Sequence, residues 1–323
     1  MKLSIIVPVY NIEKYIIRCL ESLYRQDIPL NEYEVIIVDD GSTDNSPALI
    51  NDFMKDKINA LILTQENRGL GVTRNTGFWR AKAEYIWFVD GDDYIEKNCF
   101  QEIYNIIKRG DLDIMQFNIK NIENCGIKES NFINSKRNQD IVSGKLILRE
   151  KKIYHAVWSA VFKRVFLEKN NLLFKEKLYY EDNEWSIRAY YFASRVLLNN
   201  KYYYYYNNIR LSSITKTVSA RHVFDALQIS IFMIDFCESI HRNDIARPAC
   251  RYYAAVMFNI SLENLSKMND TNIEKLFISK LTMQRKRIIK TMLLSRSLKY
   301  IIESFLIFVS IPLLIKIYKR IKI

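Results

Sequence analysis

Three carboxylates lie close together near residue 90, directly after the apolar run YIWFV. The segment FVDGDDYI places Asp90, Asp92 and Asp93 within four positions. Close carboxylates resist joint ionisation, and a bound cation relieves that repulsion. Two ordinary explanations stay open, because Asp-Gly-Asp is common turn chemistry and either later aspartate could cap a helix.

A second acidic turn follows an earlier apolar run. Val35–Val38 leads directly into DDGSTD, which contains Asp39, Asp40 and Asp44. One aspartate is enough for a turn or a helix cap. Two turns with three aspartates each therefore favour a function that needs negative charge.

The first 118 residues contain short β-branched runs that alternate with stretches of helical periodicity. This alternation predicts an α/β, Rossmann-like fold, a mostly parallel sheet with helices on both faces. Ligands bind at the carboxyl ends of the strands in such sheets, which is where both acidic turns fall. The predicted strands are Leu3–Val9, Val35–Val38, Ala60–Thr64, Tyr85–Val89 and Ile114–Asn118.

Mg²⁺ or Mn²⁺ is the cation that suits this site, because both ions prefer oxygen ligands and Mg²⁺ often shares substrate phosphates. The three histidines are far apart in sequence, which argues against zinc. No Walker-type GxxxxGK[ST] or GxGxxG motif occurs. The glycine-rich segment Asn67–Asn75 could instead approach a phosphate, and Arg68 or Arg74 could pair with a diphosphate or with the aspartates.

Four segments together resemble family 2 glycosyltransferases with a GT-A fold. They are SIIVPVYN, EVIIVDDGSTDNS, ENRGLGVTRNTG and YIWFVDGDD, and they cover residues 3–118 in the family's order. The later segments LYYED and YYYYYNNIRLSSIT are similar to the branch that builds bacterial capsular and surface polysaccharides.

The resemblance implies a role for each matching residue. Asp92 would bind the metal, and Asp182, in LYYED, would be the catalytic base that accepts the proton of the attacking hydroxyl. The alternative for Asp182 is that it only begins a helix, where acids are favoured. The residues implied to bind the nucleotide-sugar are Pro8, Tyr10, Asp39, Asp40, Asn67, Arg74, Asp90 and Asp93. Arg210 is a weak further candidate for the metal or the diphosphate.

Changes in composition predict the domain organisation. Residues 1–215 would form the GT-A catalytic domain, with a nucleotide-sugar half at 1–118 and an acceptor half at 140–215. The polar segment Asn121–Gln139 is typical of a loop, and Tyr202–Tyr206 of a strand. Residues 216–299 would form a helical C-terminal region, followed by a tail at 300–323.

The charge is concentrated near the C-terminus. Eleven of the basic residues and one acid lie between Lys280 and Ile323, giving that segment +10 of the net +12. The apolar stretch Tyr300–Ile315 is shorter than the ~20 residues of a spanning helix. We therefore expect the tail to bind an anionic membrane surface, with docking on the body or a homodimer contact as alternatives.

The sequence predicts an inverting, metal-dependent glycosyltransferase. The donor would be a nucleotide-sugar, most simply a UDP-sugar, and the acceptor a hydroxyl of a lipid-linked or surface glycan. Five scattered cysteines and no signal peptide favour the cytoplasm, on the inner face of the membrane. Little in the sequence favours nucleic acid. A scaffold that binds sugar nucleotide and a sugar nucleotidyltransferase are the alternatives.

Overall fold

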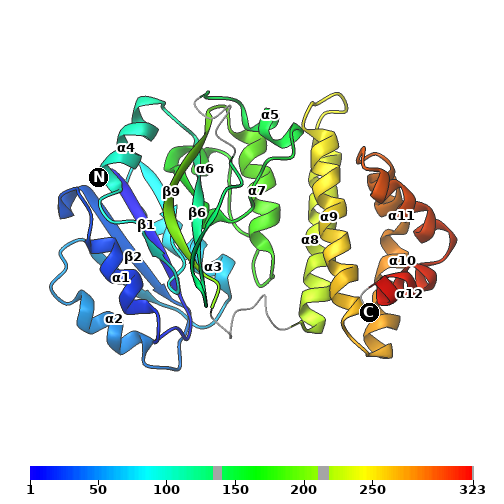
Figure 1. Ribbon diagram of the computed structural model, residues 1–323, viewed down its shortest axis with the longest axis horizontal. Helices are drawn as coiled ribbons and strands as arrows, with labels where there is room; N and C mark the ends of the chain where they lie inside the picture. The colour runs from blue at the N-terminus through cyan, green and yellow to red at the C-terminus, as the bar shows by residue number, and fades with distance from the viewer. Residues whose placement is uncertain (134–139, 210–217, 322–323) are drawn as a thin grey trace. The chain divides into compact units, whose positions relative to one another are not determined.

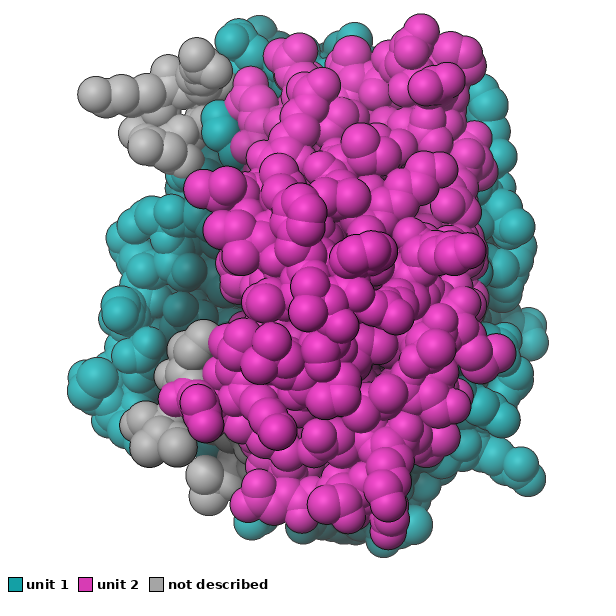
Figure 2. Space-filling view, turned by 90° about the vertical axis from the view of Figure 1, so that its right-hand side faces the viewer, with its two compact units in different colours: residues 1–144, 152–178, 189–210 teal, residues 145–151, 179–188, 211–323 magenta. Residues whose placement is uncertain are grey.

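The computed structural model describes residues 1–133, 140–209 and 218–321 (Figure 1). Arg210, the segment LSSIT and Lys322 of the sequence-based predictions lie outside the described residues. The chain forms two compact units, coloured separately in Figure 2. Unit 1 contains residues 1–144, 152–178 and 189–210, and unit 2 contains residues 145–151, 179–188 and 211–323.

Unit 1 is built on one mixed sheet, which has nine strands in the described part of the chain. Its order is β3-β2-β1-β4-β8-β6-β9-β5, and β7 pairs with β6. The strands are β1 (Leu3–Val9), β2 (Tyr33–Asp39), β3 (Ala60–Thr64), β4 (Tyr85–Phe88), β5 (Tyr94–Ile95), β6 (Ile114–Glu123), β7 (Gly126–Ser130), β8 (Ala160–Lys163) and β9 (Val196–Asn207).

The parallel sheet predicted from the sequence is confirmed for β3, β2, β1 and β4. All seven residues of β1 and of β2 are buried, as expected for strands covered on both faces. Beyond β4 the sheet becomes mixed, because β8 runs antiparallel to both β4 and β6 while β6 and β9 are parallel.

Helices cover both faces of the parallel strands. Ile5 and Val7 point into a core that also contains Leu20 of α1 and Phe100 of α4. Ile6 points to the opposite face, where Gly77 of α3 lies so close that a Cβ would come within 2.4 Å of its side chain. The helices of this unit are α1 (Ile16–Tyr24), α2 (Ser46–Met54), α3 (Leu70–Arg80), α4 (Phe100–Arg109) and α6 (Arg164–Lys169), with 3₁₀ turns η1 (Leu30–Glu32) and η3 (Val157–Ser159).

The loop predicted for Asn121–Gln139 is wrong in its first part. The strand β6 continues to Glu123, turns at Gly126 with φ +128°, and returns as β7, which pairs along it. Most residues of β7 are exposed, so the strand shows no apolar alternation that the sequence could reveal. Residues 134–139 of this prediction lie outside the described residues.

Unit 2 is mainly helical, as predicted for the region after Val218. Ser230 Oγ of α8 donates to the carbonyl of Ala254 on α9 at 2.8 Å, and the two helices lie side by side (Figure 1). No helix in the described ranges is long and apolar enough to cross a membrane. The helices are α8 (Ala220–Ser239), α9 (Arg247–Ser266), α10 (Thr271–Leu293), α11 (Leu298–Val309) and α12 (Ile311–Ile321); α5 (Gly144–Arg149) and α7 (Glu181–Phe192) have residues in both units.

Candidate active site

The end of β1 contributes Pro8 and Tyr10. The pairing of β1 with β4 stops at Ile6, so the missing N–H of Pro8 leaves no ladder bond unmade on that side. Tyr10 is 45% exposed, which leaves its ring available to stack on a flat ligand. Asn11 follows at φ +50°, and its Oδ1 accepts the Thr43 N–H at 2.8 Å, joining the DDGSTD turn to β1.

Asp39 and Asp40 are buried at the end of β2. Asp39 Oδ1 accepts the Ser42 N–H at 3.1 Å, which is turn chemistry. Asp40 Oδ1 accepts from Arg68 N at 2.9 Å and from Gln65 Nε2 at 2.7 Å, and its Oδ2 accepts from Gly69 N at 2.8 Å. Asp40 therefore fixes the glycine-rich segment to β2. A carboxylate has about four acceptor positions, so Oδ2 can accept one further donor.

Two glycines allow these segments to meet. Gly41 has φ +75°, and a Cβ there would lie 3.1 Å from the backbone nitrogen of Asn67. Gly91, between the later aspartates, would bring a Cβ within 3.2 Å of the Pro8 carbonyl oxygen. The ends of β1, β2 and β4 are thus joined at the edge of the sheet that the sequence predicts, with Asn67 exposed beside them.

Part of the negative charge near residue 90 is neutralised by Arg74 of α3. Arg74 is 2% exposed, and its Nη2 lies 2.8 Å from Asp90 Oδ1. Its guanidinium carbon also lies 5.4 Å from the centre of the Phe174 ring. Of the two partners that the sequence left open for Arg74, the structure shows an aspartate of the same site.

The side chain of Asp93 is buried and bound to β9. Its Oδ2 accepts the Tyr204 hydroxyl at 2.6 Å, its Oδ1 accepts the Asn207 N–H at 2.7 Å, and only 1% of the residue is exposed. Burial, and then the Asp92 and Asp90 carboxylates, raise the pKa of Asp93 well above its usual range. Both carboxylate oxygens of Asp93 are thus bonded to β9, and its contact with the donor stays a prediction.

Tyr204 is the residue of this site that sequence reasoning missed. Its hydroxyl oxygen also accepts the Asp90 N–H at 3.1 Å, so one side chain holds both ends of the turn. The Asp93 N–H donates to the Asp90 carbonyl at 3.0 Å and closes that turn. Tyr204 lies in the tyrosine run, and nothing in the run distinguishes it from its neighbours.

Asp92 lies between Gly91 and the buried Asp93 in this turn. It is half-buried, and its carboxylate is close enough to raise the pKa of Asp93. In the described ranges no group of three or more His, Cys, Asp or Glu could hold a metal. Carboxylates such as those of Asp90 and Asp92 suit an ion that is held by one or two carboxylates together with substrate phosphates.

Asp182 belongs to unit 2 and lies in the first turn of α7. It is half-buried, and its Oδ1 accepts from Asn183 Nδ2 at 2.9 Å. The other two acids of that turn, Glu181 and Glu184, are 5% and 3% exposed. Glu184 also forms a 2.6 Å ion pair with Arg188. Asp182 is therefore the most exposed of the three carboxylates.

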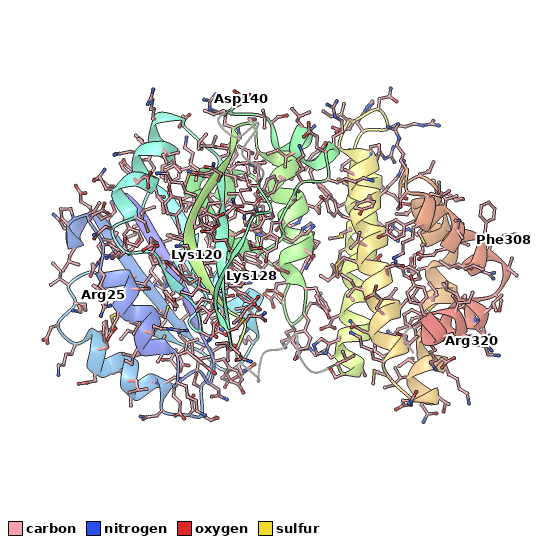
Figure 3. The ribbon with its side chains drawn as sticks, viewed as in Figure 1. Arg25, Lys120, Lys128, Asp140, Phe308 and Arg320 are labelled. Carbon is pink, nitrogen blue, oxygen red and sulfur yellow. The ribbon has the colours of Figure 1, made fainter. Side chains whose placement is uncertain are left out.

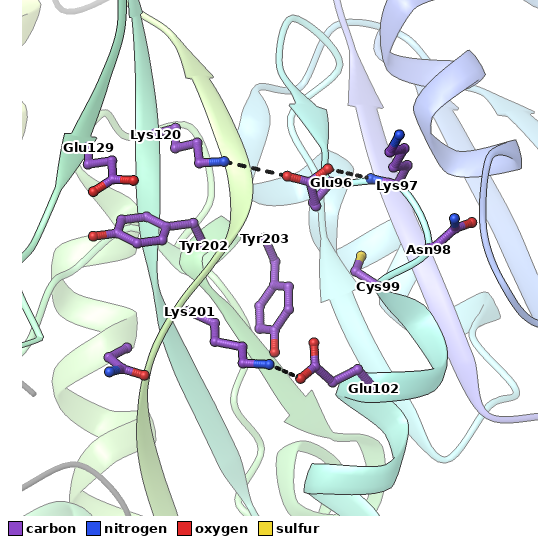
Figure 4. A pocket seen from close by; sticks show the side chains of 11 residues that line it. Glu96, Lys97, Asn98, Cys99, Glu102, Lys120, Glu129, Lys201, Tyr202 and Tyr203 are labelled. Atoms are coloured by element: carbon purple, nitrogen blue, oxygen red, sulfur yellow. Dashed lines mark hydrogen bonds and ion pairs between the residues drawn. The ribbon is translucent and has the colours of Figure 1, made fainter.

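A separate polar hollow of about 430 Å³ lies in unit 1, beside β5, β9 and the start of α4 (Figure 4). Lys120 and Glu96 form an ion pair of 3.5 Å within it, and Lys201 pairs with Glu102. None of the predicted site residues lines it. Its charges largely neutralise one another, so we assign it no role in the site.

The fold and the site are typical of one class of protein. An edge of parallel strands carries buried aspartates, a glycine-rich loop and an accessible aromatic ring, as in α/β enzymes that bind nucleotides. The profile of glycosyl transferase family 2 matches residues 4–172, just over half of the chain. The protein therefore belongs to glycosyl transferase family 2, and the prediction of a glycosyltransferase of this family is confirmed.

Several curated relatives cover part of the chain. Poly(ribitol-phosphate) beta-glucosyltransferase of Bacillus spizizenii is 36% identical over 201 residues, 61% of this chain and 30% of that protein. Poly(ribitol-phosphate) beta-N-acetylglucosaminyltransferase TarS of Staphylococcus aureus is 33% identical over 199 residues, 61% of this chain and 34% of that protein. The match thus spans about a third of these two relatives.

Solved structures confirm the predicted GT-A fold. Residues 1–349 of S. aureus TarS, in complex with UDP-GlcNAc, match with a TM-score of 0.78 at 23% identity, over 99% of this chain and 91% of that chain. The mannosyltransferase PcManGT from Pyrobaculum calidifontis, in complex with GDP-Man and Mn²⁺, matches with a TM-score of 0.56 at 16% identity, over 94% and 86% of the two chains.

Proposed function

We propose that this protein is an inverting glycosyltransferase that moves a sugar from a UDP-sugar to a hydroxyl of a lipid-linked or surface glycan. The observation that carries the proposal is the joined edge of β1, β2 and β4. There Asp40 fixes the glycine-rich loop, Arg74 pairs with Asp90, and Asp92 stays accessible. The relatives named as acting on poly(ribitol-phosphate) are consistent with such an acceptor.

The donor nucleotide would bind at this edge through three features. The half-exposed ring of Tyr10 would stack on the base above Pro8, and the remaining acceptor position of Asp40 Oδ2 would take the base's imino N–H. The exposed Asn67 would face the ribose or the diphosphate. Asp39 would keep the shape of the turn rather than touch the donor.

Asp92 would hold Mn²⁺ or Mg²⁺. The accessible carboxylate suits a hard cation that completes its coordination with diphosphate oxygens, and Arg74 keeps the adjacent Asp90 paired. When bound, the ion would offset the negative charge that develops on the departing diphosphate. The bonds of Tyr204 and Asn207 to the adjacent Asp93 would hold the turn, and with it Asp92, in place at the donor.

Asp182 would act as the general base. In inverting transfer one carboxylate takes the proton of the acceptor hydroxyl while that oxygen attacks the anomeric carbon, opposite the departing nucleotide. The accessible carboxylate of Asp182 meets that need, whereas Glu184 is occupied by Arg188. A carboxylate has about four acceptor positions, and Asn183 Nδ2 occupies one of those of Asp182.

The C-terminal helices would hold the enzyme on an anionic membrane surface. Helix α11 packs on unit 2 through Tyr300, Ser304 and Ile307, and its opposite side exposes an apolar stripe. Phe308 in this stripe points outward (Figure 3), and the stripe comprises Leu298, Ile302, Phe305, Phe308 and Val309. Helices α10 to α12 and their links also carry exposed cations, namely Lys286, Lys290, Arg296, Lys316 and Arg320. Apolar side chains beside cations are typical of membrane-surface helices.

A donor-hydrolysis screen tests this function without knowledge of the acceptor. Purified protein would be mixed with UDP-, GDP-, dTDP- and CMP-sugars, with Mn²⁺ or with EDTA, and released nucleotide measured. We expect slow, Mn²⁺-dependent release of UDP, lost in Asp92→Ala at an unchanged melting temperature. Release that is equal in EDTA, or kept in Asp92→Ala, would overturn the metal assignment. Binding of a donor without release would favour the scaffold, and no binding of any donor would overturn the proposed function.

A further inference from the structure

The segment that carries Asp182 is held by the helical unit. Residues 179–188 belong to unit 2, together with residues 211–323, and not to the unit that contains the sheet. Helices α8 and α9 make specific polar contacts with Tyr179 and Tyr180, the two residues directly before the first turn of α7. This arrangement links the base of the proposed reaction to helices that carry none of the family's motifs.

The backbone at Tyr179 is bound by a carboxylate of α8. The Tyr179 N–H donates to Asp225 Oδ2 at 3.0 Å, and Arg221 Nε lies 3.2 Å from the same oxygen. The Arg221 guanidinium lies 4.1 Å from the centre of the Tyr179 ring. Asp225 therefore binds the main chain and orients the arginine that covers the Tyr179 side chain.

Tyr180 has an unusual backbone conformation, which a contact with α9 helps to retain. Its φ is +65°, a region that non-glycine residues seldom occupy unless the surrounding structure imposes it. Asn264 Nδ2 of α9 donates to its hydroxyl at 3.1 Å, and Asn264 is 5% exposed. The Tyr180 carbonyl accepts the Asn183 N–H at 3.1 Å, which opens the first turn of α7.

His222 of α8 completes the contact with both tyrosines. Its ring centre lies 4.7 Å from that of Tyr179 and 6.2 Å from that of Tyr180. Its own position is fixed at the start of α8, because Nδ1 accepts the Ser219 N–H at 3.1 Å and lies 2.9 Å from Ser219 Oγ. The N-terminal end of α8 thus forms a rigid support for the segment.

We propose that Asp225 and Asn264 are positioning residues for the catalytic base, acting through the backbone of Tyr179 and Tyr180. Asp182 follows the strained Tyr180 by two residues, so rotation about the Tyr180 backbone would carry the carboxylate away from its place. The helical unit would then be part of the catalytic apparatus and not only an anchor. This inference rests on the proposed function, in which Asp182 accepts the proton.

Asp225→Ala and Asp235→Ala form a matched pair for the test. Both acids lie on α8 and both pair with an arginine, but Asp235 binds Arg287 of α10. Hydrogen–deuterium exchange would be followed at the amides of residues 179–183 in the full chain. We expect faster exchange there in Asp225→Ala than in either wild type or Asp235→Ala, because the Tyr179 N–H loses its acceptor.

UDP release from UDP-glucose and UDP-GlcNAc gives the functional readout. We expect Asp225→Ala to lower kcat by about tenfold to a hundredfold with an unchanged donor KM, since the base but not the donor site is displaced. Asp225→Asn, which keeps an acceptor oxygen, should restore most of the rate. In an Asp182→Ala background, Asp225→Ala should cause no further loss, because both changes then act on the same step.

The outcomes separate the two proposals. Segment exchange that is the same in Asp225→Ala and Asp235→Ala, or an equal loss of kcat in both, would overturn the positioning role. Wild-type activity that survives Asp182→Ala, or no release from either donor, would overturn the proposed function, and the exchange measurement would still decide whether α8 holds the segment.

Discussion

The hydroxyl of Tyr204 is expected to stabilise the fold because it joins two parts of the acidic turn. It donates to Asp93 Oδ2 at 2.6 Å and accepts the Asp90 N–H at 3.1 Å, and Tyr204 is fully buried. Tyr204→Phe removes the hydroxyl oxygen, so Asp93 Oδ2 loses a donor and the Asp90 N–H loses an acceptor. Water has little access to replace the bond to Asp93, which is 1% exposed.

The expected loss of stability in Tyr204→Phe can be estimated from these two hydrogen bonds. The raised pKa of Asp93 favours its neutral form, and a neutral hydrogen bond contributes about 0.5–1.5 kcal/mol, so Tyr204→Phe should lower the free energy of unfolding by about 1–3 kcal/mol. At about 2–4 °C per kcal/mol for domains of 150–250 residues, the melting temperature should fall by about 2–12 °C. UDP release should fall as well, because the turn that carries Asp92 loosens.

Tyr203→Phe is the matched control. Tyr203 is the preceding residue of β9 and is also buried, but its hydroxyl forms no hydrogen bond of normal geometry with any described residue, Glu102 and Asn199 acting on it only weakly. Removing an unpaired hydroxyl is nearly neutral or stabilising. Calorimetric melting of both variants provides the assay. If Tyr204→Phe melted at the same temperature as Tyr203→Phe, the bracing of the turn by Tyr204 would be refuted.

Three further predictions test other parts of the account. Arg74→Met should lower the free energy of unfolding by about 3–5 kcal/mol in chemical denaturation, because it leaves Asp90 largely buried and unpaired; unchanged stability would contradict a buried ion pair. Because the folded-state pKa of Asp93 is raised, its contribution to stability is fully present below the unfolded value of about 3.9 and is lost as the pH rises through the folded value. Asp93→Asn should flatten the fall of stability with pH in that window, and an equally steep fall would show that another group titrates. Phe305→Ser with Phe308→Ser should reduce co-sedimentation with vesicles containing phosphatidylglycerol without changing UDP release; full binding to those vesicles would favour docking of another protein on this exposed face.

The strand-end aspartates could be located from the sequence because strands and turns leave local patterns. The runs Leu3–Val9 and Ala60–Thr64 agree with the observed β1 and β3, and the fully buried β1 is the continuous apolar run expected of a strand covered on both faces. The meeting of the acidic turns followed from the parallel order of the sheet. It needed no knowledge of side-chain contacts.

The partners of the aspartates could not be predicted, because they come from distant parts of the chain. Tyr204 is 111 residues beyond Asp93, and five consecutive tyrosines give no sign of which one points into the site. The aspartates looked like one cluster that needs a cation. The structure instead pairs Asp90 with Arg74, binds both carboxylate oxygens of Asp93 to β9, and leaves Asp92 half-buried.

The contacts between the LYYED segment and the helices of unit 2 could not be predicted from the sequence either. Asp225 and Asn264 lie in helices with ordinary composition, and their contacts with Tyr179 and Tyr180 depend on tertiary packing. The hairpin of β6 and β7 was missed for a different reason. The strand β7 is mostly exposed and buries little, so the alternation of apolar and polar residues that marks a strand is absent there.

Calorimetric titration of UDP into the protein tests the central claim most directly. The account predicts that UDP binds in the presence of Mn²⁺, that EDTA or Asp92→Ala greatly weakens this binding, and that Asp182→Ala leaves it unchanged. Binding that is unaffected by both Mn²⁺ and Asp92→Ala would contradict the assignment of the β1, β2 and β4 edge as the metal-assisted nucleotide-sugar site.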